Sequence, residues 1–216
     1  MKAYFISGLA ADGRVFKHIQ LPKGLETIYL NWIPPQEEEA LPHYALRLAT
    51  SINTKEPFVL LGLSFGGMLA IEIAKQLHPV STILISSIPV SDHLPGYFKA
   101  AGKIGLHKMV PVSLVKSAAA TKRFLTHESS TDKRLLWQII DESDPRIIRW
   151  GMDAILKWEN KEVPKPYWHI HGSKDEVLPL KYTKPTHIIH GAGHMLIMEH
   201  ADEVNMILRE ILGNAK

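Results

Sequence analysis

The stretch FVLLGLSFGG, residues 58–67, decides the fold that this sequence predicts. Its first four residues are apolar and indicate a buried strand, and residues 67–77 carry apolar side chains at helical spacing. Ser64 therefore lies where a strand turns sharply into a helix, in a G-x-S-x-G pattern that projects the serine hydroxyl away from the backbone. Gly62 and Gly66 supply the small neighbours that such a crowded turn requires.

Two later stretches carry a second and a third motif. Residues 166–179, PYWHIHGSKDEVLP, indicate a strand followed by a loop with Asp175, and residues 191–195, GAGHM, form a glycine-rich loop with His194. Together with the serine turn, and in the order Ser, Asp, His, these motifs resemble the α/β-hydrolase family. The resemblance covers nearly the whole chain except its middle. It implies an α/β-hydrolase fold, in which helices flank a mainly parallel sheet and a helical cap is inserted.

The resemblance also implies a set of three reacting side chains. Ser64 would be the nucleophile, His194 the base that takes its proton, and Asp175 the carboxylate that orients the histidine. Two alternatives stay open at this point. Asp92 follows an earlier predicted strand, where some relatives place the acid, and His190 is the nearest rival to His194.

A further implication of the resemblance is an oxyanion hole made of two backbone N–H groups, those of Leu9 and Phe65. In the family, the loop after the first strand often begins His-Gly, whereas here residues 7–8 are Ser-Gly. The corresponding donor is Leu9, with Ala10 as the less favoured neighbour. The missing histidine leaves open how the side chains of this loop are hydrogen-bonded.

Strands and helices alternate along most of the chain, which indicates a mainly parallel sheet with right-handed crossovers. Strands are predicted at residues 2–7, 27–32, 58–61, 81–87, 167–171 and 186–190, and helices at residues 41–52, 67–77 and 201–212. A predicted strand precedes each of the four site segments, at Leu9, Ser64, Asp175 and His194. Because functional groups gather at the carboxyl ends of the strands in such sheets, this shared placement supports one common site.

Residues 90–162 interrupt the alternation and look all-helical. Helices are predicted at residues 111–125 and 131–140, and a third begins with Asp144 as N-cap and Pro145 at its first position. We therefore expect an α/β-hydrolase core of residues 1–89 and 163–216, and a helical cap or lid of residues 90–162. Large apolar side chains of the insertion either line an acyl pocket or hold the cap to the body, and for any single one the second role is favoured; they are Tyr97, Phe98, Met109, Phe124, Trp137, Trp150 and Trp158.

Metal and cofactor sites have little support in the sequence. His169 and His171 alternate along a predicted strand and share a face, and three more histidines cluster at residues 187–194. No carboxylate stands at a recognised ligand spacing, and neither H-E-x-x-H nor a glycine-rich nucleotide motif occurs. His171 is interpreted as part of the H-G turn before the acid loop. We expect no metal and no cofactor.

The composition is that of an ordinary globular protein. The 216 residues are 45% apolar and 22% charged, with a net charge of +3, and the basic residues are scattered, which gives nucleic-acid binding little support. No run is long enough to span a bilayer, and residues 3–11 are interpreted as a strand and its loop rather than a signal peptide, so we expect a cytoplasmic protein. The absence of cysteine excludes disulfides and a cysteine nucleophile, and the oligomeric state is left open.

These features predict a serine hydrolase of the carboxylesterase or thioesterase type, which cleaves an acyl bond of a small molecule through an acyl-enzyme intermediate. A serine rather than an aspartate at the turn argues against the epoxide-hydrolase and haloalkane-dehalogenase branches of the family. The Ser-His-Asp set alone does not distinguish ester, thioester, amide, lactone or carbon–carbon bond cleavage, which differ in cap and pocket. The alternative is a small-molecule binding protein or receptor on the same fold, with little or no turnover.

Overall fold

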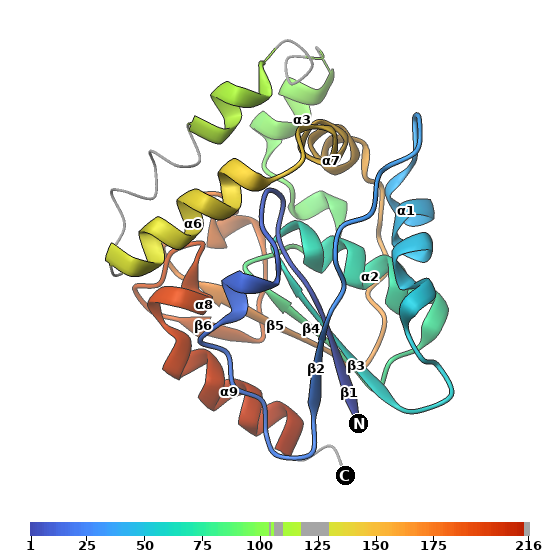
Figure 1. Cartoon of the computed structure of the whole chain (residues 1–216), viewed down its shortest axis with the longest axis vertical. Helices are drawn as coiled ribbons and strands as arrows, with labels where there is room; N and C mark the ends of the chain where they lie inside the picture. The colour runs from blue at the N-terminus through green and yellow to red at the C-terminus, as the bar shows by residue number, and fades with distance from the viewer. Residues whose placement is uncertain (104, 106–109, 118–129, 214–216) are drawn as a thin grey trace.

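A six-stranded parallel sheet forms the centre of the molecule (Figure 1). The computed structural model describes residues 1–103, 105, 110–117 and 130–213. Every neighbouring pair of strands is parallel, and the strands lie in the order β2 (Glu26–Tyr29), β1 (Lys2–Ile6), β3 (Phe58–Leu63), β4 (Ser81–Ile85), β5 (Tyr167–Gly172) and β6 (His187–Ile189). All six strands lie at predicted positions, so the expected mainly parallel sheet is confirmed.

Helices cover both faces of the sheet (Figure 1). One face packs against α1 (Leu41–Leu48) and α2 (Phe65–Leu77), and the other against α8 (Leu196–Glu199) and α9 (Ala201–Gly213). Strand side chains point alternately to the two faces, so each face of the central strands contributes to its own apolar core. Short 3-10 turns occur at Gly13–Phe16, Ala49–Ser51, Ser91–His93 and Leu180–Tyr182.

The described residues of the segment between β4 and β5 contain helices and irregular connections but no strand. It contains α3 (Gly96–Lys103), helical residues 112–117, α6 (Ser130–Glu142) and α7 (Pro145–Lys157). Asp144 caps α7 by accepting a hydrogen bond from the Arg146 N–H at 2.8 Å, as the Asp-Pro pair predicts. Figure 1 shows α3, α6 and α7 beyond the carboxyl ends of the strands. The rest of the predicted helix at residues 111–125 lies outside the described residues.

Among the strands that end before their predicted limits, β2 differs most from its prediction. The apolar run at residues 27–32 predicts a strand up to Trp32, but β2 ends at Tyr29. Beyond it the Ile33 N–H and C=O both hydrogen-bond the Tyr44 hydroxyl of α1, at 3.0 and 2.8 Å. These contacts with α1 lead the chain away from the edge of the sheet after Tyr29. The spacing of apolar residues in the sequence does not predict such a contact.

None of the helices in the described part of the chain has the length and apolar character needed to cross a bilayer.

Candidate active site

Ser64 occupies a strained turn between β3 and α2. Its backbone dihedrals are φ 52° and ψ −119°, in a region that L-residues rarely adopt. The turn is held by the Ser64 N–H, which donates to the Ile85 carbonyl at 2.9 Å, and by the Ser64 carbonyl, which accepts from the Ser87 hydroxyl at 2.6 Å. These bonds tie the turn to β4 and to the chain just beyond it, so the strain at Ser64 is supported by the neighbouring strand.

The two glycines of the motif are required by close backbone contacts. A Cβ on Gly62 would lie 2.4 Å from the Gly66 carbonyl oxygen, and a Cβ on Gly66 would lie 2.2 Å from the Ile6 carbonyl oxygen. Real Cβ atoms do not approach backbone oxygens this closely. The turn after β3 can therefore pack beside β1 only with glycine at both positions.

The structure brings Ser64, His194 and Asp175 together. His194 Nε2 lies 3.0 Å from Ser64 Oγ, and His194 Nδ1 lies 2.8 Å from Asp175 Oδ2. The ionised carboxylate can only accept, so Nδ1 carries the proton of the neutral imidazole and Nε2 is free to accept from the serine hydroxyl. Three loops at the carboxyl ends of β3, β5 and β6 supply the three side chains.

Asp175 is fixed and buried, with 3% of its surface exposed. Its Oδ1 accepts hydrogen bonds from the backbone N–H groups of Val177 and Leu178, at 2.9 and 2.8 Å, which leaves Oδ2 for His194. Burial by itself raises the pKa of a carboxyl, but the electrostatic interactions with His194 and His171 and the hydrogen bonds from His194 and the Leu178 N–H together hold the Asp175 pKa below its usual 3.8. The carboxylate is therefore ionised throughout the neutral range.

The loop after β1 lies directly beside Ser64. A Cβ on Gly8 would be 3.2 Å from Ser64 Cβ. The Leu9 N–H has no hydrogen-bond partner among the described residues, and the Phe65 N–H, the first of α2, has no partner within its helix. Both predicted donors thus lie in segments that adjoin the serine, and their N–H groups are not used to stabilise the fold.

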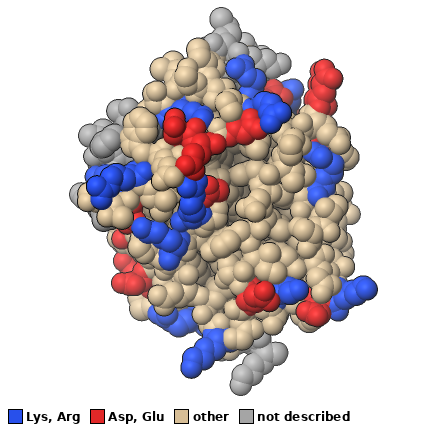
Figure 2. Space-filling view, viewed as in Figure 1, with Lys and Arg blue, Asp and Glu red and all other residues tan. Residues whose placement is uncertain are grey.

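A small cavity of about 60 Å³ adjoins Ser64 and His194. It is also lined by the loop after β1 and by Leu136 and Ile140 of α6. An outer hollow of about 270 Å³ shares Ala10 and Ala11 with it, and acidic and basic side chains gather over this part of the surface in Figure 2. Another hollow, of about 890 Å³ between α3 and α7, is lined by Asp92 and Trp158 but by none of Leu9, Ser64, Phe65, Asp175 and His194.

The sequence profile of the Alpha/beta hydrolase family matches residues 31–207. The chain belongs to this family. Solved structures with the same fold include an esterase from Thermogutta terrifontis, with 16% identity and a TM-score of 0.69 over 98% of this chain and 89% of that one. MenH from S. aureus has 16% identity and a TM-score of 0.74, over 99% and 93% of the two chains. The enol-lactonase from Burkholderia xenovorans LB400 has 12% identity and a TM-score of 0.72, over 99% and 91%. No curated protein matches the sequence significantly.

The other acid and base candidates of this α/β hydrolase lie apart from Ser64. The Asp92 side chain is 73% exposed and lies 3.6 Å from the Lys99 ammonium. His190 is exposed at the end of β6, whereas His194 is 8% exposed. The described residues contain no group of three or more His, Cys, Asp or Glu side chains that could hold a metal ion.

Two tryptophans of the segment between β4 and β5 hold this segment to the rest of the molecule. Trp158 is buried and its indole N–H donates to Glu72 of α2 at 2.8 Å, and the Trp150 indole N–H donates to the Glu39 carbonyl at 2.8 Å. Tyr97 and Trp137 are exposed. None of these four lines the cavity beside Ser64, and Met109 and Phe124 lie outside the described residues.

Sequence reasoning missed the part played by Ser7 and Trp32. The Ser7 hydroxyl, which stands where relatives often have histidine, donates to the Ala11 carbonyl at 2.9 Å, and the Trp32 indole N–H donates to the same carbonyl at 2.7 Å. These two hydrogen bonds show how side chains hold the loop after β1 where the histidine of the relatives is missing. A signal was available for Trp32, because it follows a strand on the edge where the other site residues lie.

Two buried histidines stand behind Asp175. His171 does not form a turn, as the H-G motif suggests, but lies inside β5, with a buried ring whose Nε2 donates to the Leu178 carbonyl at 2.8 Å and lies 3.4 Å from Asp175 Oδ2. Neutral His171 then accepts at Nδ1, where His169 Nε2 donates at 3.1 Å. His171 therefore supports the loop whose backbone holds the carboxylate.

Acidification below about pH 6.5 is expected to destabilise the protein through His169. Burial, followed by the neighbouring rings of His171 and His93, lowers the His169 pKa from 6.5 to about 3. In the unfolded chain His169 takes up a proton near pH 6.5, whereas in the folded chain it takes up this proton only near pH 3. The free energy of unfolding should therefore fall by up to about 1.4 kcal/mol per pH unit below 6.5. Burial also lowers the His171 pKa, which adds to the loss in the same direction.

Urea denaturation at pH 7 and pH 5 measures this effect. The His169→Gln variant keeps an N–H donor for His171 but does not titrate, so it should lose less stability than the wild type between the two pH values. Equal losses in the two proteins would show that His169 does not carry the pH dependence.

Proposed function

We propose that this α/β hydrolase is a serine hydrolase that cleaves an ester or thioester bond of a small molecule. The observation that carries the proposal is the continuous hydrogen-bond chain from Ser64 through His194 to Asp175, with both contacts of the histidine at 3.0 Å or less. A serine hydroxyl is a poor nucleophile at neutral pH, and this arrangement is the one that activates it.

The proposed reaction has two halves. Ser64 Oγ attacks the acyl carbon while His194 Nε2 takes its proton, and the bond to the leaving group breaks as His194 returns that proton to the leaving oxygen or sulfur. Water then attacks the acyl-enzyme, giving one proton to His194, and the acid departs as Ser64 recovers its proton. In each half the N–H groups of Leu9 and Phe65 would stabilise the tetrahedral oxyanion.

The cavity beside Ser64 supports a small acyl group. Its volume is only about 60 Å³, and its walls from α6 are apolar. We propose that residues 90–162 act as the cap of this enzyme, because Leu136 and Ile140 of α6 line the cavity together with Ser64, His194 and the loop after β1, which we call the oxyanion loop. An acetyl or similarly short chain fits this space better than a long one.

Labelling with alkyl fluorophosphonates tests the proposal. These probes phosphonylate a serine that is activated by a base, so peptide mapping of the wild-type protein should place the label on Ser64, and His194→Ala should not be labelled. A probe with an ethyl chain should label faster than one with a dodecyl chain. Folded protein that reacts with neither probe would contradict the proposal and favour a ligand-binding role for the same cavity.

A further inference from the structure

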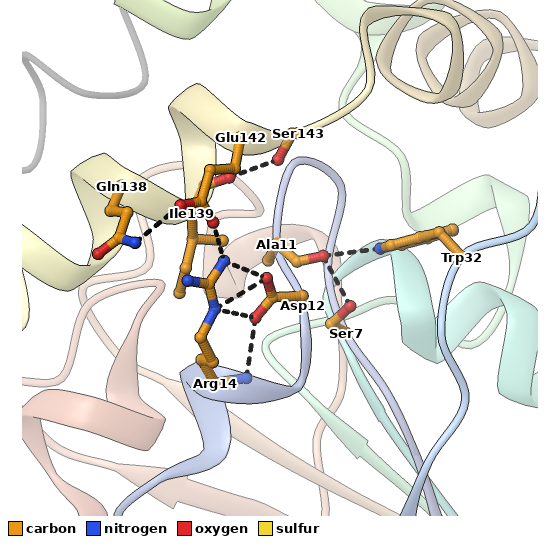
Figure 3. Close-up of polar contacts among 9 residues, drawn as sticks. All are labelled: Ser7, Ala11, Asp12, Arg14, Trp32, Gln138, Ile139, Glu142 and Ser143. Carbon is orange, nitrogen blue, oxygen red and sulfur yellow. Dashed lines mark hydrogen bonds and ion pairs between the residues drawn. The ribbon is translucent and has the colours of Figure 1, made fainter.

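The Ala11 carbonyl is the anchor of the loop that carries the proposed oxyanion donor (Figure 3). It accepts two hydrogen bonds, from Ser7 Oγ at 2.9 Å and from Trp32 Nε1 at 2.7 Å. The Ala11 N–H donates back to the Gly8 carbonyl at 3.1 Å, which closes the turn around Leu9 and Ala10. The position of the Leu9 N–H relative to Ser64 therefore depends on how firmly Ala11 is held.

The same turn contains strained backbone. Ala10 has φ 57°, in the left-handed region that a residue with a Cβ adopts at a cost in free energy. Such strain persists only where surrounding contacts oppose relaxation. The two hydrogen bonds to the Ala11 carbonyl supply contacts of this kind.

Trp32 also contacts the second half of the proposed oxyanion hole. Its indole ring stacks on the Phe65 ring, with 5.7 Å between centroids and 10° between planes. Phe65 is 1% exposed and begins α2, so its N–H is fixed by the same packing. Trp32 thus contacts both segments that carry the proposed donors: its indole N–H binds the loop after β1, and its ring face packs on Phe65.

The ion pairs that Arg14 forms with Asp12 and Glu142 hold this loop less firmly. Arg14 pairs with Asp12 within the loop at 2.6 Å and with Glu142 of α6 at 2.5 Å (Figure 3). The three side chains are between 36% and 49% exposed, and ion pairs at such exposure contribute little because water screens them. The ion pairs join the loop to α6, but they hold the donor less firmly than the bonds at Ala11.

We propose that Trp32 is a positioning residue that holds the two N–H groups of the oxyanion hole at the separation the transition state requires. The proposal rests on the proposed function, since it concerns the same serine site. Such donors must lie about 2.7–3.1 Å from the oxyanion, and complete loss of one costs about 10²–10³ in kcat. Loss of the indole N–H would loosen the Leu9 segment without removing its donor, so we expect a smaller fall of about tenfold in kcat with little change in KM.

The matched pair Trp32→Phe and Trp150→Phe tests this role. Both tryptophans lie 5.7 Å from the Phe65 ring, and both donate an indole hydrogen bond to a backbone carbonyl. Only the Trp32 acceptor belongs to the oxyanion loop, whereas Trp150 donates to Glu39. With p-nitrophenyl acetate, Trp32→Phe should lose about tenfold in kcat and Trp150→Phe less than about twofold, at similar melting temperatures.

The inhibition constant of a trifluoromethyl ketone provides a second measurement, which a general loss of protein stability would not change. It adds to the active serine as a hemiketal whose oxyanion occupies the hole, so its inhibition constant should rise in Trp32→Phe by the same factor as kcat falls. Ser7→Ala removes the other bond to Ala11 and should show the same pattern, which keeps the test valid if Trp32→Phe does not fold.

Three outcomes would overturn the inference. Equal kcat values in the two tryptophan variants, a change confined to KM, or an unchanged inhibition constant in Trp32→Phe would each show that Trp32 does not position the donors. Failure of the proposed function would look different, because the wild-type protein itself would then react with neither the fluorophosphonate nor the ester.

Discussion

Replacement of Asp175 by asparagine is expected to lower kcat for p-nitrophenyl acetate about 10⁴-fold. The asparagine can keep the bonds that Oδ1 accepts from Val177 and Leu178, so its amide nitrogen would face His194 in place of Oδ2. An amide N–H donates, which forces the proton of the imidazole from Nδ1 to Nε2. A histidine in that tautomer cannot accept the proton of Ser64.

Steady-state kinetics of Asp175→Asn beside Asp92→Asn checks this expectation. Asp92 is the other acid that the sequence offers, and its side chain is exposed and lies near Lys99. Asp92→Asn should therefore keep wild-type kcat. If Asp175→Asn kept more than about a tenth of the activity while Asp92→Asn lost it, the assignment of the acid would be wrong.

Gly66→Ala is expected to lower the free energy of unfolding by about 3 kcal/mol or more. The new Cβ would lie 2.2 Å from the Ile6 carbonyl oxygen and 2.5 Å from that of Ser7. Both atoms belong to the backbone at the end of β1, which pairs on both sides within the sheet and cannot swing aside as a side chain does. Either α2 moves away from the sheet, or the hydrogen bonds at this end of β1 are disturbed.

Thermal unfolding followed by circular dichroism measures this effect, with an expected fall in Tm of about 6–12 °C for a chain of this size. Gly96→Ala is the matched control, because no atom lies within 4 Å of its Cβ position at the start of α3. The control should change the free energy of unfolding by less than about 0.5 kcal/mol. A wild-type Tm for Gly66→Ala would contradict the close packing of α2 against β1.

The sequence by itself determined the class of fold, because the signals for it are local. The sequence indicated all six strands, the G-x-S-x-G turn marked the junction of β3 and α2, and the Asp-Pro pair marked the start of α7. Each signal is a spacing of side chains or a backbone requirement within a few residues, so it does not depend on contacts between distant parts of the chain. The order of the three motifs also indicated Ser64, Asp175 and His194 as the candidate site residues.

Only the tertiary structure decided which of these residues meet. The contact between Ser64 and His194 spans 130 positions, and the indole bond of Trp32 crosses between two strand ends, so both depend on strand order and loop paths. The same applies to His171, whose ring lies beside Asp175 because β5 turns back at Gly172. Side-chain periodicity carries no information on such distances, since they are settled when the helices and strands pack together.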